Sequence, residues 1–199
     1  MYFRLKILDL RTFEQRFLPQ AFDLLSPQEL AKYQSFGSKK RRYQWLAVRY
    51  LTYKEFGIRE KIQYAPTGQP MLNCCKISVS HTDQLVAVGL SNSALGIDIE
   101  QKNRNFRRIA VKYVSANEPQ NLSDWHLSLL WSAKEAVYKL WAEGGLSFKQ
   151  NIVLNLPEKT GLYGRFTGKI IKNSREVAVF LSYYVFNQHF ITIARYEKP

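Results

Sequence analysis

"GIDIE" at residues 96–100 is the stretch that decides how the second half of this chain is expected to fold. Side chains alternate along a β-strand, so Ile97 and Ile99 share one face while Asp98 and Glu100 share the other. We therefore expect a strand that places both isoleucines in a core and both carboxylates together. Two like charges at this spacing repel each other unless a cation lies between them.

The two carboxylates admit two interpretations. Hard oxygen ligands on one rigid face suit Mg²⁺, which usually takes one or two carboxylates together with substrate phosphates. Alternatively, the strand face is exposed to solvent and the acids pair with Lys102 or Arg104. The spacing by itself leaves both interpretations open.

Downstream of this strand, "DWHLSLLWSAKEAVYKLWAEGG" at residues 124–145 predicts a long helix that the closing pair of glycines ends. Trp131, Glu135 and Lys139 are four residues apart, so they lie along one stripe of the helix. Glu135 and Lys139 stand in the favourable order for an ion pair along the helix, which at an exposed surface is worth a few tenths of a kcal/mol. The large aromatic in the same stripe predicts that this face is packed.

The remaining chain predicts further strands and helices. Alternating apolar residues indicate strands at 2–10, 76–82 and 85–91, and a meander of strands from residue 151 onward. Ser26, followed by Pro27 and Glu29, predicts a capped helix start, and a second helix follows from Ser38.

The two halves of the chain echo each other weakly. Each begins with a short strand and continues to a helix that contains Trp-x-Ala, at Trp45 and at Trp131. This echo is a weak sign of duplication. It places the boundary near Ser93, with an N-terminal half at residues 1–92 and a C-terminal half at 93–199.

Composition limits the class of protein. The chain has 199 residues, of which 46% are hydrophobic, so it can bury a sizeable core. It has no run of 18 apolar residues and its N-terminus lacks the features of a signal peptide, so we expect a cytoplasmic protein. The formal net charge of +13 attracts a polyanion, such as nucleic acid, an anionic membrane, a phosphorylated small molecule or an acidic protein. Charge alone does not choose among these partners.

Two further segments are candidates for binding phosphate. Ser80 and His81 end a predicted strand, where a histidine is more often a hydrogen-bonded structural residue than a catalyst. The basic run "KKRR" at residues 39–42 is either a solvated helix face or a phosphate site. No arrangement typical of a hydrolase triad and no phosphate loop of the GxxxxGK[ST] kind is present in the sequence.

Together these segments resemble the 4′-phosphopantetheinyl transferase superfamily. The family pattern G-[IV]-D-[IL]-E, followed by W-[ST]-x-K-E-[AS]-x-x-K, matches residues 96–100 and 131–139 in full. Upstream, "SHT" at 80–82 matches the family's S-H-[ST], and "TGQP" at 67–70 resembles its G-K-P. Gln69 replaces the lysine of that last motif, and glutamine can hydrogen-bond a phosphate but brings no charge.

The resemblance implies a reaction and its partners. An enzyme of this family moves the 4′-phosphopantetheine arm of coenzyme A onto a serine of an apo acyl or peptidyl carrier protein and releases adenosine 3′,5′-bisphosphate. The carriers, typically acidic, serve fatty-acid, polyketide or nonribosomal peptide synthesis. The chain length matches the larger, two-halved class, which implies a monomer with two α+β halves packed as a pseudo-dimer and the active site between them. Neither nucleic acid nor a membrane is implied as a partner.

The resemblance also implies roles for residues of the C-terminal half. Asp98, Glu100 and Glu135 would gather Mg²⁺, or Mn²⁺, on the pyrophosphate of coenzyme A. Glu135 would also take the proton of the serine, directly or through water. Lys139 would stabilise the pyrophosphate oxygens, with Lys134 as a second helper, so the implied catalytic set is Glu135, Lys139 and Asp98.

The same resemblance implies a second set of residues in the N-terminal half. Ser80 and His81 would hold phosphates at the nucleotide end of coenzyme A, together with Arg41 or Arg42. Gln69 would contribute a hydrogen bond at the position of the family lysine.

A nucleic-acid-binding protein without catalysis is the alternative from another class. The net charge of +13, the twelve tyrosines and the twelve phenylalanines would suit it. It predicts polynucleotide binding that depends strongly on salt and has no need for three acids.

Overall fold

The computed structural model describes residues 2–102 and 104–196. The chain divides into two compact units, unit 1 at Met1–Asn92 and unit 2 at Ser93–Pro199. Each unit combines an antiparallel sheet with helices, which confirms the predicted α+β class. Within the described residues, none of the helices combines the length and apolar content that a membrane crossing needs.

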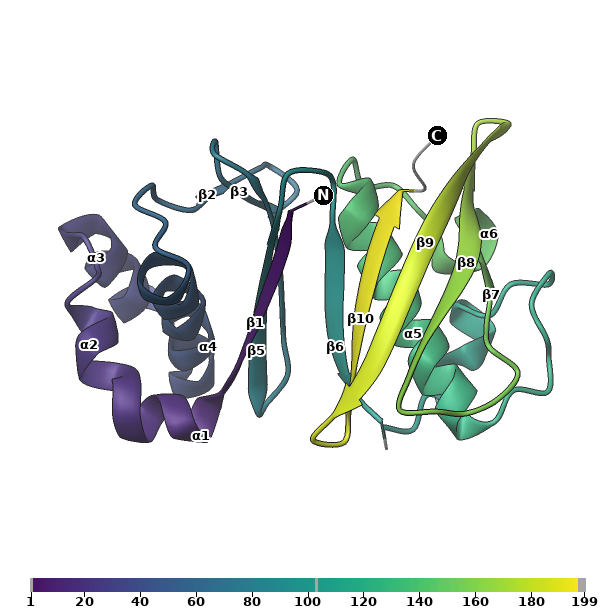
Figure 1. The fold of residues 1–199 in the computed structure, drawn as a ribbon, viewed down its shortest axis with the longest axis horizontal. Helices are drawn as coiled ribbons and strands as arrows, with labels where there is room; N and C mark the ends of the chain where they lie inside the picture. The colour runs from purple at the N-terminus through teal and green to yellow at the C-terminus, as the bar shows by residue number, and fades with distance from the viewer. Residues whose placement is uncertain (1, 103, 197–199) are drawn as a thin grey trace. The chain divides into compact units, whose positions relative to one another are not determined.

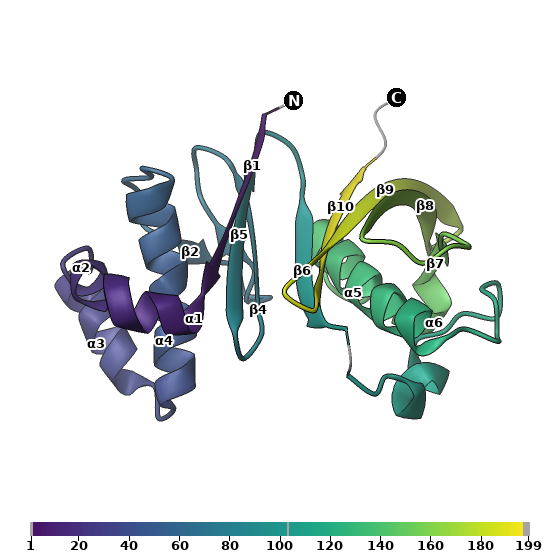
Figure 2. The same ribbon diagram turned by 60° about the horizontal axis from the view of Figure 1, so that its bottom comes forward.

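In the described part of unit 1, three strands form an antiparallel sheet in the order β1-β5-β4, with helices on one face (Figure 2). A small hairpin of β2 and β3 accompanies this sheet. The strands are β1 (Phe3–Asp9), β2 (Gln63–Tyr64), β3 (Pro70–Met71), β4 (Lys76–His81) and β5 (Leu85–Ser91). The helical segments are α1 (Leu10–Thr12), the π-helical η1 (Phe13–Phe17), α2 (Leu18–Phe22), α3 (Pro27–Ser35), α4 (Lys39–Arg49) and the π-helical η2 (Tyr50–Glu55).

The helix starts of unit 1 follow the capping signals in the sequence. The Ser26 hydroxyl accepts from the Glu29 N–H at 3.4 Å, and the Glu29 carboxylate accepts from the Ser26 N–H at 3.2 Å, which confirms the predicted capping box. The Ser38 hydroxyl caps α4 by accepting from the Arg41 N–H at 3.4 Å, and Gly57 with φ +72° follows η2. The helical segments between Leu10 and Phe22 were not predicted, because each is only a turn or so long.

The core of unit 1 lies between these helices and the sheet. Leu46 and Ala47 of α4 and Tyr50 of η2 are buried in one cluster with Val86 and Val88 of β5. Tyr50 lies four residues after Leu46 and three after Ala47, so the three side chains share one helical face.

In the described part of unit 2, five strands form an antiparallel sheet in the order β6-β10-β9-β8-β7, and α5 runs along one face of it (Figure 1). The strands are β6 (Gly96–Gln101), β7 (Ile152–Asn155), β8 (Tyr163–Lys172), β9 (Arg175–Phe186) and β10 (His189–Tyr196). The helices are the 3-10 helix η3 (Arg107–Lys112), α5 (Asp124–Trp141) and α6 (Phe148–Asn151).

The long predicted helix is confirmed, with an end that differs from the prediction. Ser123 caps its start and accepts from the His126 N–H at 3.4 Å. The helix ends at Trp141, because Ala142 already adopts a positive φ of 64°. The two glycines that were expected to stop it, Gly144 and Gly145, come two residues later and also have positive φ.

Gly96 sets how closely β6 approaches α5. A Cβ atom at this position would lie 1.8 Å from the carbonyl oxygen of Ala136 and 2.6 Å from the backbone nitrogen of Leu140. Only glycine therefore fits at this contact. Because side chains alternate along β6, Asp98 and Glu100 lie on the same face as Gly96 and point to the side of the sheet that carries α5.

We predict that Gly96→Ala lowers the free energy of unfolding by at least about 2 kcal/mol, because the new methyl group meets backbone atoms that cannot turn away. Gly37→Ala is the matched control, since an added Cβ there has nothing within 4 Å; it should change stability by less than about 1 kcal/mol. Urea unfolding followed by circular dichroism measures both. Equal stability of the two variants would contradict the close approach.

Candidate active site

The acids of β6 and the charged residues of α5 meet on one side of the sheet of unit 2. Asp98 is buried, and its Oδ1 atom accepts from the Lys139 ammonium at 2.8 Å. The Glu100 carboxylate accepts from the Arg104 guanidinium at 3.2 Å. Lys139 thus forms an ion pair that joins α5 to β6, and its charge also acts on Glu135. The alternative pairing of Glu100 with Arg104 is present.

Strand β10 completes this side of the site. Thr192 lies directly opposite Asp98 in the β6–β10 pairing and is fully buried. Its hydroxyl oxygen accepts from the Ser132 hydroxyl of α5 at 3.0 Å. This bond fixes α5 to the sheet beside the acids, and sequence reasoning missed it because a single threonine in a meander strand gives no signal.

The negative charge of Asp98 acts on both of the other carboxylates. Burial raises the pKa of Glu135, and the negative charge of Asp98 raises it further, while Lys139 acts in the opposite direction. Burial likewise raises the pKa of Glu100, a hydrogen bond from the Gln101 N–H lowers it, and the charge of Asp98 raises it again. The raised pKa values mean that the protein around the site disfavours the ionised forms of Glu100 and Glu135.

The donor set can be tested against a divalent metal ion. Among the described residues, no three His, Cys, Asp or Glu side chains stand close enough, as placed, to hold an ion. One oxygen of Asp98 is turned to Lys139, and one oxygen of Glu100 is turned to Arg104. In chemistry the set nevertheless fits Mg²⁺, because a cation beside these carboxylates would offset the negative charge that helps to raise the pKa values of Glu100 and Glu135.

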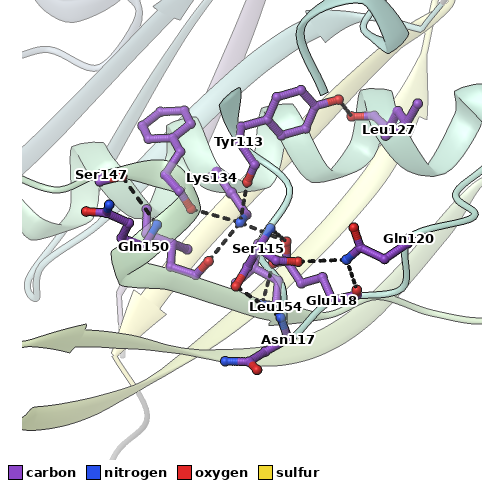
Figure 3. Close-up of polar contacts among 12 residues, drawn as sticks. Tyr113, Ser115, Asn117, Glu118, Gln120, Leu127, Lys134, Ser147, Gln150 and Leu154 are labelled. Carbon is purple, nitrogen blue, oxygen red and sulfur yellow. Dashed lines mark hydrogen bonds and ion pairs between the residues drawn. The ribbon is translucent and has the colours of Figure 1, made fainter. Parts of the chain in front are cut away.

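Lys134 lies elsewhere than the family resemblance implies. Its side chain is fully buried, and its ammonium donates to the carbonyl oxygens of Tyr113 and Ile152 at 2.7 Å and of Phe148 at 2.9 Å. The Glu118 carboxylate accepts from it at 2.9 Å (Figure 3). An ammonium has only three protons to donate, so these acceptors use all of them. These contacts leave the ammonium no free proton for coenzyme A and argue against the helper role that the resemblance implies.

Glu118 is the buried counter-ion of Lys134. Its carboxylate also accepts from the backbone N–H groups of Ser115 at 2.7 Å and Leu154 at 2.9 Å. Burial lowers the pKa of Lys134, and the negative charge of Glu118 acts against this shift. Glu118 lies in a loop outside any periodic segment, so the sequence gives no sign of its role.

Unit 1 brings two of the predicted phosphate-binding segments together. Ser80 is buried and His81 is exposed at the end of β4. The turn that follows is tied to α4, because the Gln44 amide donates to the carbonyl oxygen of Thr82 at 2.8 Å. The basic run 39–42 forms the first turn of the same helix.

The two candidate arginines of that run differ in their surroundings. Arg42 is half-buried and donates from Nε to the carbonyl oxygen of Phe36 at 2.8 Å. Arg41 is exposed, with its guanidinium 5.8 Å from the ring centre of Phe36. Gln69, the third candidate of unit 1, lies in the turn between β2 and β3, where its carbonyl oxygen accepts from the Ala65 N–H at 2.9 Å.

We predict that Glu135→Gln stabilises the protein at neutral pH. The raised pKa of Glu135 means that ionisation opposes folding, so the wild type loses stability as the pH rises from the ordinary value near 4.3 through the raised one. The gain of the variant should therefore vanish near pH 4 and grow above it, by about 1.4 kcal/mol for each unit by which the pKa is raised. Urea unfolding of both proteins from pH 4 to 8 measures the difference. A difference that does not change with pH, or that shrinks as the pH rises, would contradict the shift.

Comparison with known proteins bears on the same segment. The family model of the 4′-phosphopantetheinyl transferase superfamily matches residues 94–194, slightly more than half of the chain. None of the curated proteins matches the chain. The matched segment contains Asp98 and Glu100 on β6 and Glu135 and Lys139 on α5. This agrees with the resemblance seen in the sequence, and the chain belongs to the 4′-phosphopantetheinyl transferase superfamily.

Proposed function

We propose that this chain transfers the 4′-phosphopantetheine arm of coenzyme A to a serine of an apo carrier protein. The products are the holo carrier and adenosine 3′,5′-bisphosphate. The observation that carries the proposal is the meeting of Asp98 with Lys139 and Glu135 at the contact of β6 with α5, inside the segment that the family model matches.

Lys139 is suited to hold the diphosphate of coenzyme A. Its ammonium is partly exposed and lies 2.8 Å from Asp98, so it can reach a phosphate oxygen beside the acids. Mg²⁺ or Mn²⁺ would be held by Asp98, Glu100 and Glu135, and it would neutralise charge on the diphosphate. Binding of the diphosphate would release the carboxylates from their present partners.

Glu135 is suited to accept a proton. Its raised pKa brings it closer to neutral pH, where a general base is most effective. It would take the proton of the serine hydroxyl, directly or through water, as the serine oxygen bonds to the phosphorus that carries pantetheine. The bond from that phosphorus to the bridging oxygen breaks, and adenosine 3′,5′-bisphosphate leaves.

Residues of unit 1 would hold the nucleotide end of coenzyme A. We assign its phosphates to Ser80 and His81, with Arg41 as the more exposed of the two candidate arginines. Gln69 would contribute a neutral hydrogen bond. Lys134 takes no part in binding, because its ammonium is enclosed by protein oxygens.

The carrier protein would be recognised through charge. A net charge of +13 attracts an acidic partner over distances near the Debye length and speeds its association. An acyl or peptidyl carrier of fatty-acid, polyketide or nonribosomal peptide synthesis fits this requirement. We further assign the chain to the larger, two-halved class of the superfamily and expect a monomer that acts in the cytoplasm.

The experiment is an intact-mass measurement on a panel of apo carrier proteins incubated with the protein, coenzyme A and Mg²⁺. We predict a gain of one phosphopantetheine group that EDTA abolishes. Glu135→Ala should slow the transfer by about 100-fold or more, the usual effect of removing a general base. Glu158→Ala, on an exposed loop, is the matched control and should transfer at the wild-type rate. No mass gain on any carrier would contradict the proposed function.

A further inference from the structure

Lys134 joins α5 to two separate stretches of unit 2. One is the segment that begins directly after η3, through the carbonyl oxygen of Tyr113 at 2.7 Å. The other is α6 and the start of β7, through the carbonyl oxygens of Phe148 at 2.9 Å and Ile152 at 2.7 Å. A single ammonium thus holds both stretches against the same turn of the helix (Figure 3).

Glu118 ties the same two stretches together from the other side. Its carboxylate accepts from Lys134 at 2.9 Å, from the Ser115 N–H at 2.7 Å and from the Leu154 N–H at 2.9 Å. The side chains of Glu118 and Lys134 are both fully buried. A buried charge that loses its partner is strongly destabilising, so the two residues hold each other in place.

Trp131 repeats this connection with its ring. It lies one helical turn before Lys134 and packs edge-on against Tyr113, with ring centres 5.2 Å apart. The ring centre of Phe148 lies 5.5 Å away from it. Two of the three residues whose carbonyl groups accept from Lys134 therefore also pack against Trp131, so polar and aromatic contacts hold α5 at the same place.

The contacts of Trp131 and Lys134 fix the rotation of α5 about its own axis. Lys134 and Glu135 are consecutive, so their side chains leave the helix about 100° apart, as 3.6 residues per turn requires. With Lys134 fixed on one side, Glu135 and Lys139 are held on the stripe that meets Asp98. We propose that Lys134, with Glu118 as its counter-ion, is a positioning residue that fixes the rotation of α5 and makes no contact with coenzyme A.

This inference rests on the proposed function only for its kinetic test. Lys134→Met should lower kcat on the order of 100-fold, because a displacement of about 1 Å at the reacting groups has this effect. The KM for coenzyme A and its calorimetric Kd should stay within about twofold of the wild type, since a group that makes no contact adds nothing to binding. Lys139→Met, in which the substrate-facing ammonium is lost, should instead weaken coenzyme A binding at least about tenfold.

A double variant without the charges of Lys134 and Glu118 is the matched control for destabilisation by an unpaired buried charge. In Lys134→Met combined with Glu118→Gln no buried carboxylate lacks its partner, and glutamine still offers an oxygen to Ser115 or Leu154. The double variant should recover at least part of the lost kcat. A weaker Kd for coenzyme A in Lys134→Met at unchanged kcat would overturn the proposal, because it would place Lys134 in the binding site.

A second measurement needs no activity. Amide hydrogen exchange should speed up in residues 113–118, 148–154 and along α5 of Lys134→Met, and should stay unchanged in Lys149→Met, whose side chain is exposed. Unchanged exchange in Lys134→Met would overturn the positioning role even if the wild type transfers phosphopantetheine. If the wild type transfers nothing, the proposed function fails and the exchange result still decides this inference. If Lys134→Met does not fold, the kinetic and hydrogen-exchange measurements are made on Glu118→Gln instead.

Discussion

The close approach of β6 to α5 at Gly96 is the constraint on which the site of unit 2 depends. An added Cβ would lie 1.8 Å from the carbonyl oxygen of Ala136, so the strand and helix backbones are in direct contact. The alternation of β6 then carries Asp98 and Glu100 along the face that meets α5. Without this contact, the carboxylates would not lie near Lys139.

The charges at this contact explain why acids occur in so basic a chain. Burial and the negative charge of Asp98 raise the pKa values of Glu100 and Glu135. The cationic side chain of Arg104 acts against both shifts, and that of Lys139 acts against the shift of Glu135. A site of this kind stores unfavourable charge that a cation and a diphosphate together would relieve. The carboxylates that the proposed function needs therefore lower the stability of the fold around β6. The buried Lys134 and Glu118 offset this by holding α5 to the segments packed around it.

Features that follow from a periodic pattern or from a short local motif could be predicted from the sequence. The shared face of Asp98 and Glu100 follows from the period of a strand, and the Ser26 cap follows from its local pattern. The partner of Lys139 could not be predicted, because helical spacing favours Glu135 while the fold brings Asp98 to 2.8 Å. Only tertiary structure decides between a neighbour on the same helix and one on another element.

Lys134 shows the other limit of sequence reasoning. A motif fixes which residue stands next to Glu135, but the direction of a helical side chain depends on what packs around it. Glu118 lies in an aperiodic loop and becomes the counter-ion of Lys134 only when that loop folds against β7. The short helical segments between Leu10 and Phe22 were missed for a related reason, since single turns are stabilised by packing rather than by their own sequence.

The central claim is that Asp98, Glu100 and Glu135 hold a divalent metal ion on the diphosphate of coenzyme A. A crystal structure with coenzyme A and Mn²⁺, with the anomalous signal of manganese, tests it most directly. The account predicts an anomalous peak about 2.1 Å from oxygens of these carboxylates and of the diphosphate, with Lys139 turned from Asp98 to a phosphate. A manganese peak elsewhere, or a diphosphate bound away from β6 with Lys139 still on Asp98, would contradict it.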